Sequence, residues 1–376
     1  MNRKPRSLAE RDGLQTMIAS LLCIVAGLFL GYLVLLIINP KGAWDAIVAI
    51  LSNFFSFPGK LMMKYLGQTL VRTVPLLLCS LSVLFAYQVG MFNIGVAGQY
   101  TAGACIALYA ALAWNAPWYV CLVLAIAVAA VWGSIGAFLK LYFNVNIVIS
   151  GIMLNWISLY LTNWILTGVK NPNGPYTKSL QTVNPSALLP KMGLNTLFNN
   201  EKTVTIAIPL AIIIAIAVWV VLNKTVFGYE LKATGYSMNA AKYAGMNEKR
   251  NIVMTMVIAG ALAGTGAALL YLSGIEEWQT TASSVPAMGF NGIAVAFLGG
   301  LNPFGVILSS FFIQHITTGG GNIDLSVYSP QISDLIASLI IYLCAFTAFF
   351  KLMIRNRLRK KAAETAVETK EGGEKE

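Results

Sequence analysis

The sequence predicts an all-α protein that crosses a membrane many times. Hydrophobic residues make up 57% of the 376 residues, whereas charged residues make up only 11%. In a soluble domain about a quarter of the residues are charged, because its surface must face water. The apolar residues also gather in runs of the length, roughly 20 residues, that an α-helix needs to cross a bilayer. Because lipid satisfies no backbone hydrogen bonds, we expect these runs to be helices.

Eight runs are long enough to span the membrane. They cover residues 17–38, 61–87, 96–114, 118–139, 145–166, 203–222, 252–272 and 335–350. Two further runs, 287–300 and 304–317, are shorter, and the Asn302-Pro303 pair between them is typical of a turn. The short runs form either two short crossings or one re-entrant hairpin. The chain therefore has about ten transmembrane helices, or eight and a hairpin.

Basic residues indicate which side of the membrane each loop faces. They gather before the first run, in the loop 223–250 and after the last run. These three segments lie on one side if the spans alternate, and loops rich in Lys and Arg stay on the cytoplasmic side. We therefore expect a cytoplasmic N-terminus (1–16), a transmembrane domain (17–354) and a charged, disordered cytoplasmic tail (355–376). The net charge of +11 thus indicates membrane orientation and contact with lipid, not binding of nucleic acid.

The sequence lacks the patterns typical of enzymes. It has one histidine, no phosphate-binding glycine loop and no HExxH zinc pattern, and its five cysteines lie singly in apolar runs. We expect no catalytic residue, metal site or cofactor in this chain. Past residue 96 the apolar runs are almost free of charge, so a titrating relay for ion-coupled transport is not expected. Arg72 interrupts the second run and either faces a cavity or extends to the membrane surface.

Neutral polar side chains lie in or beside the apolar runs. Asn93, Gln99, Asn155 and Asn291 are predicted to line a path for a neutral polar solute, with hydrogen bonding between helices as the alternative for each.

Three of these residues belong to a weak internal repeat, GMFNIGVAGQ at 90–99 and MGFNGIAVA at 288–296. The two copies would enter the membrane from opposite sides, as in transporters built from inverted repeats, whose solute site lies at such glycine-broken segments. Chance similarity is the alternative, in which the glycines only allow close packing of helices.

The loop 223–250 predicts a short cytoplasmic helix. Ser237 is a suitable N-cap, the next seven residues would make about two turns, and Gly245 suits the left-handed position after a helix. So short a helix is not stable alone, so neighbouring loops or a partner must hold it. Ala240, Ala241 and Ala244 would give it a small-residue side that fits a groove on a partner. A helix that only faces solvent is the alternative.

The same loop resembles part of one class of ATP-driven importer. GYELKATGYSMNAAKYAGMNEKRNIVMTMVIAGALAGTGAALL is similar to the coupling segment and following helix of ABC importer permeases of the ribose and branched-chain amino acid type. The matching residues are Gly235, Ala240, Ala241, Gly245, Arg250, Gly260, Ala263 and Gly264. MFNIGVAGQ and NIVISGIMLNWISLYLTNW resemble the nucleoside-transporting group, which works with a lipoprotein of the basic-membrane-protein type. Related permeases commonly have Glu where Ala97 stands.

The resemblance implies a permease subunit in the bacterial cytoplasmic membrane, with both termini cytoplasmic. Its partners would be a second permease, ABC ATPase subunits that bind ATP and Mg²⁺, and an extracellular substrate-binding lipoprotein. The residues implied to couple it to the ATPase are Glu230, Gly235, Ser237, Ala240, Ala241, Gly245 and Arg250. Nucleosides would cross by alternating access. The alternatives are a sugar or branched-chain amino acid permease and, from another class, an autonomous channel or ion-coupled carrier.

Overall fold

The computed structural model describes residues 12–329, 331–344, 346–347 and 349–357. Most of the expected N-terminal segment 1–16 and of the charged tail 355–376 lies outside these residues. The chain divides into two compact units, one made of Met1–Ile50 with Gly320–Glu376 and the other of Leu51–Gly319. Within the described part of the chain, the regular elements are helices, with two isolated β-bridges in addition.

The predicted spans are confirmed as helices. Seven helices in the described residues are long and apolar enough to cross a membrane. They are α1 (Asp12–Ile38), α3 (Lys60–Tyr87), α4 (Val96–Ala113), α5 (Trp118–Phe143), α6 (Ile147–Leu166), α9 (Ala207–Lys224) and α12 (Glu248–Tyr271). The last predicted run bends: α15 (Ile332–Cys344) is followed by Phe349–Arg357 at an angle of 54°, and the two together make an eighth candidate.

The two shorter runs form α13 (Ala287–Leu298) and α14 (Pro303–Gly319), and the predicted turn lies between them. Asn302 caps α14, because its Oδ1 accepts a hydrogen bond from the Phe304 N–H at 3.0 Å, and Pro303 occupies the first helical position. With 12 residues, α13 rises about 18 Å, which is short of the roughly 30 Å of a bilayer core.

Several helices lie outside the predicted membrane-spanning runs. They include α2 (Ala43–Ser52), α7 (Leu180–Val183), α8 (Leu194–Leu197), α10 (Val226–Tyr236) and α11 (Met238–Tyr243). Of these, α11 is the helix expected in the 223–250 loop. The polar helix α10 was missed, although Thr225 signals its start by accepting a hydrogen bond from the Gly228 N–H at 3.1 Å.

Glycines bring α12 into direct backbone contact with its neighbours in the Leu51–Gly319 unit. A Cβ atom on Gly264 would lie 2.6 Å from the Ala125 carbonyl oxygen of α5, and one on Gly103 of α4 would lie 2.6 Å from the Gly264 Cα. Contacts this short leave no room for a side chain. Gly103 and Gly264 therefore allow close packing of these helices.

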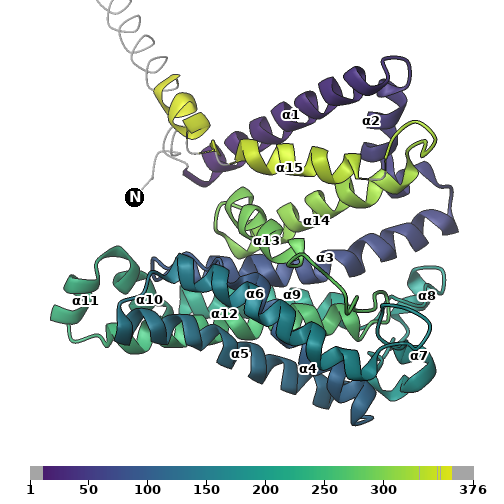
Figure 1. The fold of residues 1–376 in the computed structure, drawn as a ribbon. Helices are drawn as coiled ribbons and strands as arrows, with labels where there is room; N and C mark the ends of the chain where they lie inside the picture. Colours follow the sequence, from purple (N-terminus) through teal and green to yellow (C-terminus); the bar gives the residue numbers. More distant parts are fainter. Residues whose placement is uncertain (1–11, 330, 345, 348, 358–376) are drawn as a thin grey trace, which may run out of the picture. The chain divides into compact units, whose positions relative to one another are not determined.

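In the other unit, α1 and α15 pack through the same device and lie side by side (Figure 1). A Cβ on Gly27 would lie 2.6 Å from the Ile340 Cα, and one on Gly31 would lie 2.9 Å from the Ile336 Cγ1. The Tyr328 hydroxyl donates to the Asn39 carbonyl at 3.0 Å and ties the loop before α15 to the end of α1.

Candidate functional site

The helices of the Leu51–Gly319 unit run between two ends that carry different polar segments (Figure 1). One end holds α10 and α11, and the other holds α7 and α8. Residues expected to couple to an ATPase lie at the first end. Between the two ends lie the buried amides, and a large cavity opens at the α7–α8 end.

The predicted path residues Asn93 and Gln99 bond to each other inside the unit. The Asn93 Nδ2 donates to the Gln99 Oε1 at 3.0 Å, and the Gln99 Nε2 donates to the Asn93 Oδ1 at 3.1 Å. Asn93 also donates to the Ser82 hydroxyl at 3.3 Å. Both amides are at most 2% exposed. These bonds stabilise the non-helical segment between α3 and α4, because they join Asn93 of that segment to Gln99 in the first turn of α4.

Asn155 of α6 caps α4 from a neighbouring helix. Its Oδ1 accepts a hydrogen bond from the Gly98 N–H at 2.7 Å, and its Nδ2 donates to the Ile94 carbonyl at 3.0 Å. The residue at the N-cap, Gly95, has no side chain to satisfy the free N–H groups of the first turn. The Ser158 hydroxyl adds a bond to the Gly98 carbonyl at 2.8 Å. In this conformation, Asn155 therefore holds helices together.

Asn93 and Gln99 also line a cavity of about 10 Å³ between α4, α5, α6 and α12. The indole N–H of Trp132 at its wall is buried without a hydrogen-bond partner in the structure. The volume is that of about one water molecule, so no solute fits here in this conformation. Glycines at positions 95, 133, 136 and 151 form much of the remaining wall.

The two copies of the internal repeat meet in the structure. A Cβ on Gly289 of α13 would lie 2.5 Å from the Ala97 Cα at the start of α4. The first copy comes directly after α3 and begins at the α10–α11 end. The contact there is with α10, because a Cβ on Gly235 would lie 3.0 Å from the Gly90 N. The second copy follows the segment 272–286, which is bonded to the loop at the α7–α8 end. Asn291 lies in α13 and is half-buried.

A second, larger cavity of about 600 Å³ opens at the α7–α8 end. Sequence reasoning did not predict it, because its walls come from loop segments about 100 residues apart. Its walls carry three aromatic rings, two carboxylates and smaller polar groups. The lining residues are Tyr176, Tyr271, Gly274, Ile275, Glu276, Glu277, Trp278, Gln279, Ala282, Ser284 and Pro286.

Hydrogen bonds hold the walls of this cavity in place. The Thr177 N–H donates to the Trp278 carbonyl at 2.9 Å, and the Thr280 N–H donates to the Pro175 carbonyl at 2.8 Å. The indole of Trp278 donates to the Asn163 Oδ1 of α6 at 2.9 Å, and the Asn163 Nδ2 donates to the Ala282 carbonyl at 2.8 Å. The segment 272–286 is thus fixed both to the loop 170–180 and to α6.

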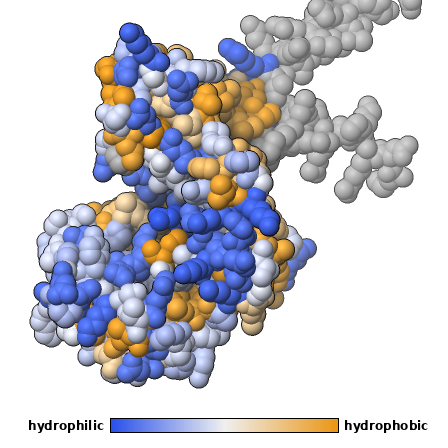
Figure 2. Space-filling model, turned by 90° about the vertical axis from the view of Figure 1, so that its right-hand side faces the viewer, coloured by the Kyte–Doolittle hydropathy of each residue, from blue (hydrophilic) through white to orange (hydrophobic). Residues whose placement is uncertain are grey.

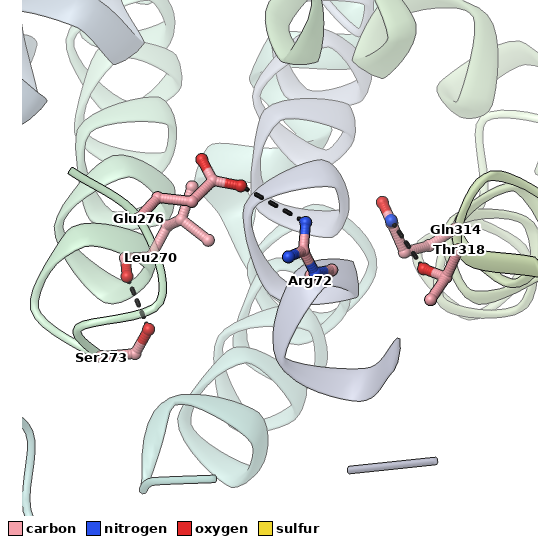
Figure 3. Close-up of polar contacts among 6 residues, drawn as sticks. All are labelled: Arg72, Leu270, Ser273, Glu276, Gln314 and Thr318. Carbon is pink, nitrogen blue, oxygen red and sulfur yellow. Dashed lines mark hydrogen bonds and ion pairs between the residues drawn. The ribbon is translucent and has the colours of Figure 1, made fainter. Parts of the chain in front are cut away.

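Arg72 reaches one of the cavity carboxylates. Its Nη1 lies 3.5 Å from the Glu276 Oε1, and the two side chains are 43% and 42% exposed (Figure 3). Arg72 thus pairs with a residue of the cavity wall, but it does not itself line the cavity, so both expectations for it stay predictions. A pair this exposed contributes at most about 1 kcal/mol to stability, because water screens it.

At the other end of the unit, both ends of α11 are capped as predicted. The Ser237 hydroxyl accepts from the Ala240 N–H at 3.3 Å. Gly245 has φ of +81°, its N–H donates to the Lys242 carbonyl, and the Met246 N–H donates to the Ala241 carbonyl, each at 3.0 Å. These two bonds form a Schellman motif, which requires a left-handed residue and favours glycine.

Contacts within the chain anchor α10 next to α11. The Asn251 Nδ2 of α12 donates to the Thr234 hydroxyl at 3.0 Å, and Asn251 is 1% exposed. Gly235 packs against the backbone of Gln88 and Gly90, where the segment that leads into α4 begins. The α10–α11 pair is therefore connected to the start of α12 and to the broken segment before α4.

The remaining residues implied in coupling differ in exposure. Ala240 and Arg250 are exposed, Glu230 is half-buried, and Ala241 is buried within this chain, so the expected alanine side of α11 is only partly open. The most exposed large hydrophobic side chains of the described residues are aromatic. Tyr236 is 96% exposed and Tyr243 is 94% exposed, although sequence reasoning did not single them out.

The single histidine has a structural environment. The His315 Nε2 lies 2.8 Å from the Leu51 carbonyl, its Nδ1 lies 3.3 Å from the Asn53 Nδ2, and its ring packs edge-on against Phe54. All five cysteines are buried and free. Among the described residues, no group of three or more His, Cys, Asp or Glu side chains is placed to hold a metal ion.

Comparisons with known proteins give a consistent result. Residues 65–345 match the family described as the branched-chain amino acid transport system permease component. The chain is 32% identical to a guanosine ABC transporter permease of Bacillus subtilis over 93% of this chain and 99% of the relative. It is 28% identical to a nucleoside ABC transporter permease of Lactococcus lactis, with both chains fully covered. A glucose ABC transporter permease of Haloferax volcanii is 28% identical over 76% of this chain and 77% of its own length. No solved structure matches.

Proposed function

The chain belongs to the family of permease components of branched-chain amino acid transport systems, and from this premise we propose that it imports nucleosides. As a family member it is a multi-pass membrane protein with a transport role, not a catalytic one. The observation that carries the proposal is the match to the guanosine and nucleoside permeases over 93% and 100% of this chain. The glucose permease relative covers less of the chain and keeps a sugar as the second candidate.

The interior chemistry supports a neutral solute. The buried polar groups around the start of α4 are amides and hydroxyls, which donate and accept hydrogen bonds without carrying charge. We propose that the small cavity beside Asn93 and Gln99 widens during transport, when these amides exchange their mutual bonds for bonds to the solute. Asn155 and Asn291 would line the same path, on α6 and α13.

We propose that the α10–α11 pair couples this chain to an ABC ATPase on the cytoplasmic side of a bacterial membrane. The basic residues of the loop 223–250 support that orientation, since loops rich in Lys and Arg stay in the cytoplasm. Both termini would then be cytoplasmic, and the α7–α8 end would face outward toward a substrate-binding lipoprotein. The ATPase would bind ATP and Mg²⁺, and a second permease would complete the membrane part.

The contacts of α10 support a route for alternating access. A partner that pushes on the exposed rings of Tyr236 and Tyr243 displaces α10 together with α11, because the two helices are joined at Ser237. The displacement reaches Gln88 through Gly235, and from there it reaches the loop that Asn93 ties to α4. Binding energy from ATP in the partner would thus change the amide contacts at the start of α4.

The proposal is tested by deleting the gene in its host and measuring uptake of radiolabelled guanosine. We expect uptake to be lost and to return when the intact gene is supplied. Excess unlabelled adenosine should compete with guanosine, whereas excess free ribose should not. Unchanged guanosine uptake in the deletion strain would reject the proposed function, and strong competition by ribose would favour the sugar.

A variant that lacks residues 236–245 tests the coupling role separately. Because α11 contributes little to the packing of the spans, we expect this variant to reach the membrane in normal amounts and to transport nothing. Uptake at the normal rate by this variant would contradict the assignment of α11 as the coupling helix.

A further inference from the structure

The cavity of about 600 Å³ at the α7–α8 end has the features of a small-molecule site. Its volume lies within the range of about 300–1,000 Å³ that ligand pockets occupy. Apolar ring faces and a few polar groups converge on it, as in such pockets. Hydrogen bonds to α6 and to the loop 170–180 fix its walls before any ligand arrives, so little conformational freedom is lost on binding.

Irregular backbone forms part of one wall of the cavity. The Thr280 hydroxyl is bonded to the Pro175 carbonyl at the α7–α8 end, and Gly289 packs against Ala97 at the start of α4. The chain between them is not helical until Ala287. Irregular backbone at membrane depth is tolerated only where it is enclosed by protein or lines a water-filled space. Ala282, Ser284 and Pro286 of this segment line the cavity.

Aromatic rings provide the apolar surface of the cavity. Trp278 and Tyr271 have ring centroids 6.0 Å apart and are 3% and 6% exposed, so they form a rigid inner wall. Tyr176 is 45% exposed and faces the cavity from the loop 170–180. Rings of this kind bind the flat face of a heterocyclic base.

The charged groups on the walls are both carboxylates, which restricts what can bind. An ionised carboxylate only accepts hydrogen bonds, so the ligand must supply O–H or N–H donors. Glu276 already has Arg72 as a partner, whereas Glu277 forms no ion pair within the described residues. A phosphate group near Glu277 would be repelled, because both groups are anionic. The lower part of Figure 2 shows the end of the unit that carries α7 and α8, and this surface is largely hydrophilic with scattered apolar residues.

We propose that this cavity is a binding site for one neutral nucleoside on the permease itself. The base lies against Trp278, Tyr271 and Tyr176, and Glu277 accepts hydrogen bonds from hydroxyl or N–H groups of the ligand. The inference rests on the proposed function and adds a site and a selectivity to it. The site holds the solute at the mouth of the path, and its carboxylates exclude nucleotides.

The test is ligand binding to the complete transporter, purified in lipid nanodiscs without the external lipoprotein and without ATP. Saturation-transfer NMR detects guanosine bound with a dissociation constant as weak as about 1 mM, or roughly −4 kcal/mol. Tyr176→Ala should weaken binding about fivefold or more, since it removes a stacking partner, and the matched variant Tyr176→Phe should bind normally. Glu277→Gln should weaken binding about tenfold.

Guanosine 5′-monophosphate provides the selectivity test. It should not displace guanosine from the unsubstituted transporter, and it should do so from the Glu277→Lys variant. Equal displacement from both, or guanosine binding that no cavity variant alters, would overturn the assignment of the site. Absence of guanosine binding would do the same, provided that gene deletion abolishes guanosine uptake. If the deletion strain keeps its uptake, the proposed function itself has failed, and the site falls with it.

Discussion

Replacing Gly235 with alanine tests whether α10 transmits movement to the start of α4. A Cβ at this position would overlap the Gln88 carbonyl oxygen and lie 3.0 Å from the Gly90 N. Relieving that overlap requires a shift of about 1 Å between α10 and the segment before α4, and overpacking of this kind costs about 1–3 kcal/mol. If that cost falls on the transporting conformation, uptake decreases by about five- to 150-fold.

The assay is ATP-driven uptake of labelled guanosine by cells that carry the substitution, with the amount of permease in the membrane measured by immunoblot. Gly168→Ala is the matched control, because this glycine also lies in a helical turn, no atom lies within 4 Å of the added Cβ, and it lines neither cavity. Alanine favours a helix over glycine at both positions, so propensity alone predicts no loss. Equal uptake by the two variants would refute the reasoning.

Four further substitutions have expected outcomes. Asn155→Leu removes two buried hydrogen bonds to the start of α4 and should lower the stability of the purified permease by about 1–3 kcal/mol, measured as a lower thermal midpoint; an unchanged midpoint would contradict its capping role. Gly264→Leu should remove the protein from the membrane fraction, because a side chain there collides with α5. Arg72→Gln and Glu276→Gln should each change the free energy of unfolding by less than about 1 kcal/mol. A larger interaction energy between the two side chains in a double-mutant cycle would show that water screens the ion pair less than its exposure indicates.

The sequence predicted the spans well, because hydropathy and helix length are set locally. Seven of the eight long runs and both short runs became helices with ends displaced by a few residues, whereas the last long run bends after α15. The turn at Asn302-Pro303 and the caps at Ser237 and Gly245 lie where the residue types indicated. The helix α10 was missed because it is polar and short, and contacts with α12 and with Gly90 hold it. Such contacts are not visible in a local pattern.

The roles of the polar residues were harder to predict for the same reason. An amide within an apolar run either binds solute or joins helices, and only the partner atoms distinguish the two. Asn155 is bonded to the α4 backbone, whereas Asn291 on α13 is half-buried. The cavity at the α7–α8 end was not predicted, because its walls meet only when the loop 170–180 binds the segment 272–286. Trp278 and Asn163, which fix that meeting, are 115 residues apart.

The glycine contacts along α12 have a mechanical consequence. Where the backbones of α12 and α5 touch directly, few rotatable side chains lie between them to absorb a displacement. We therefore expect α12 and α5 to move together as one rigid body. The helix α12 is 24 residues, or about 36 Å, long; Asn251 beside α10 lies in its first turn, and Tyr271 in the cavity wall is its last residue. A tilt of about 5° at the Asn251 end would move the Tyr271 end by about 3 Å. That displacement is enough to change the contacts of Tyr271 with a bound base without any change of conformation within α12.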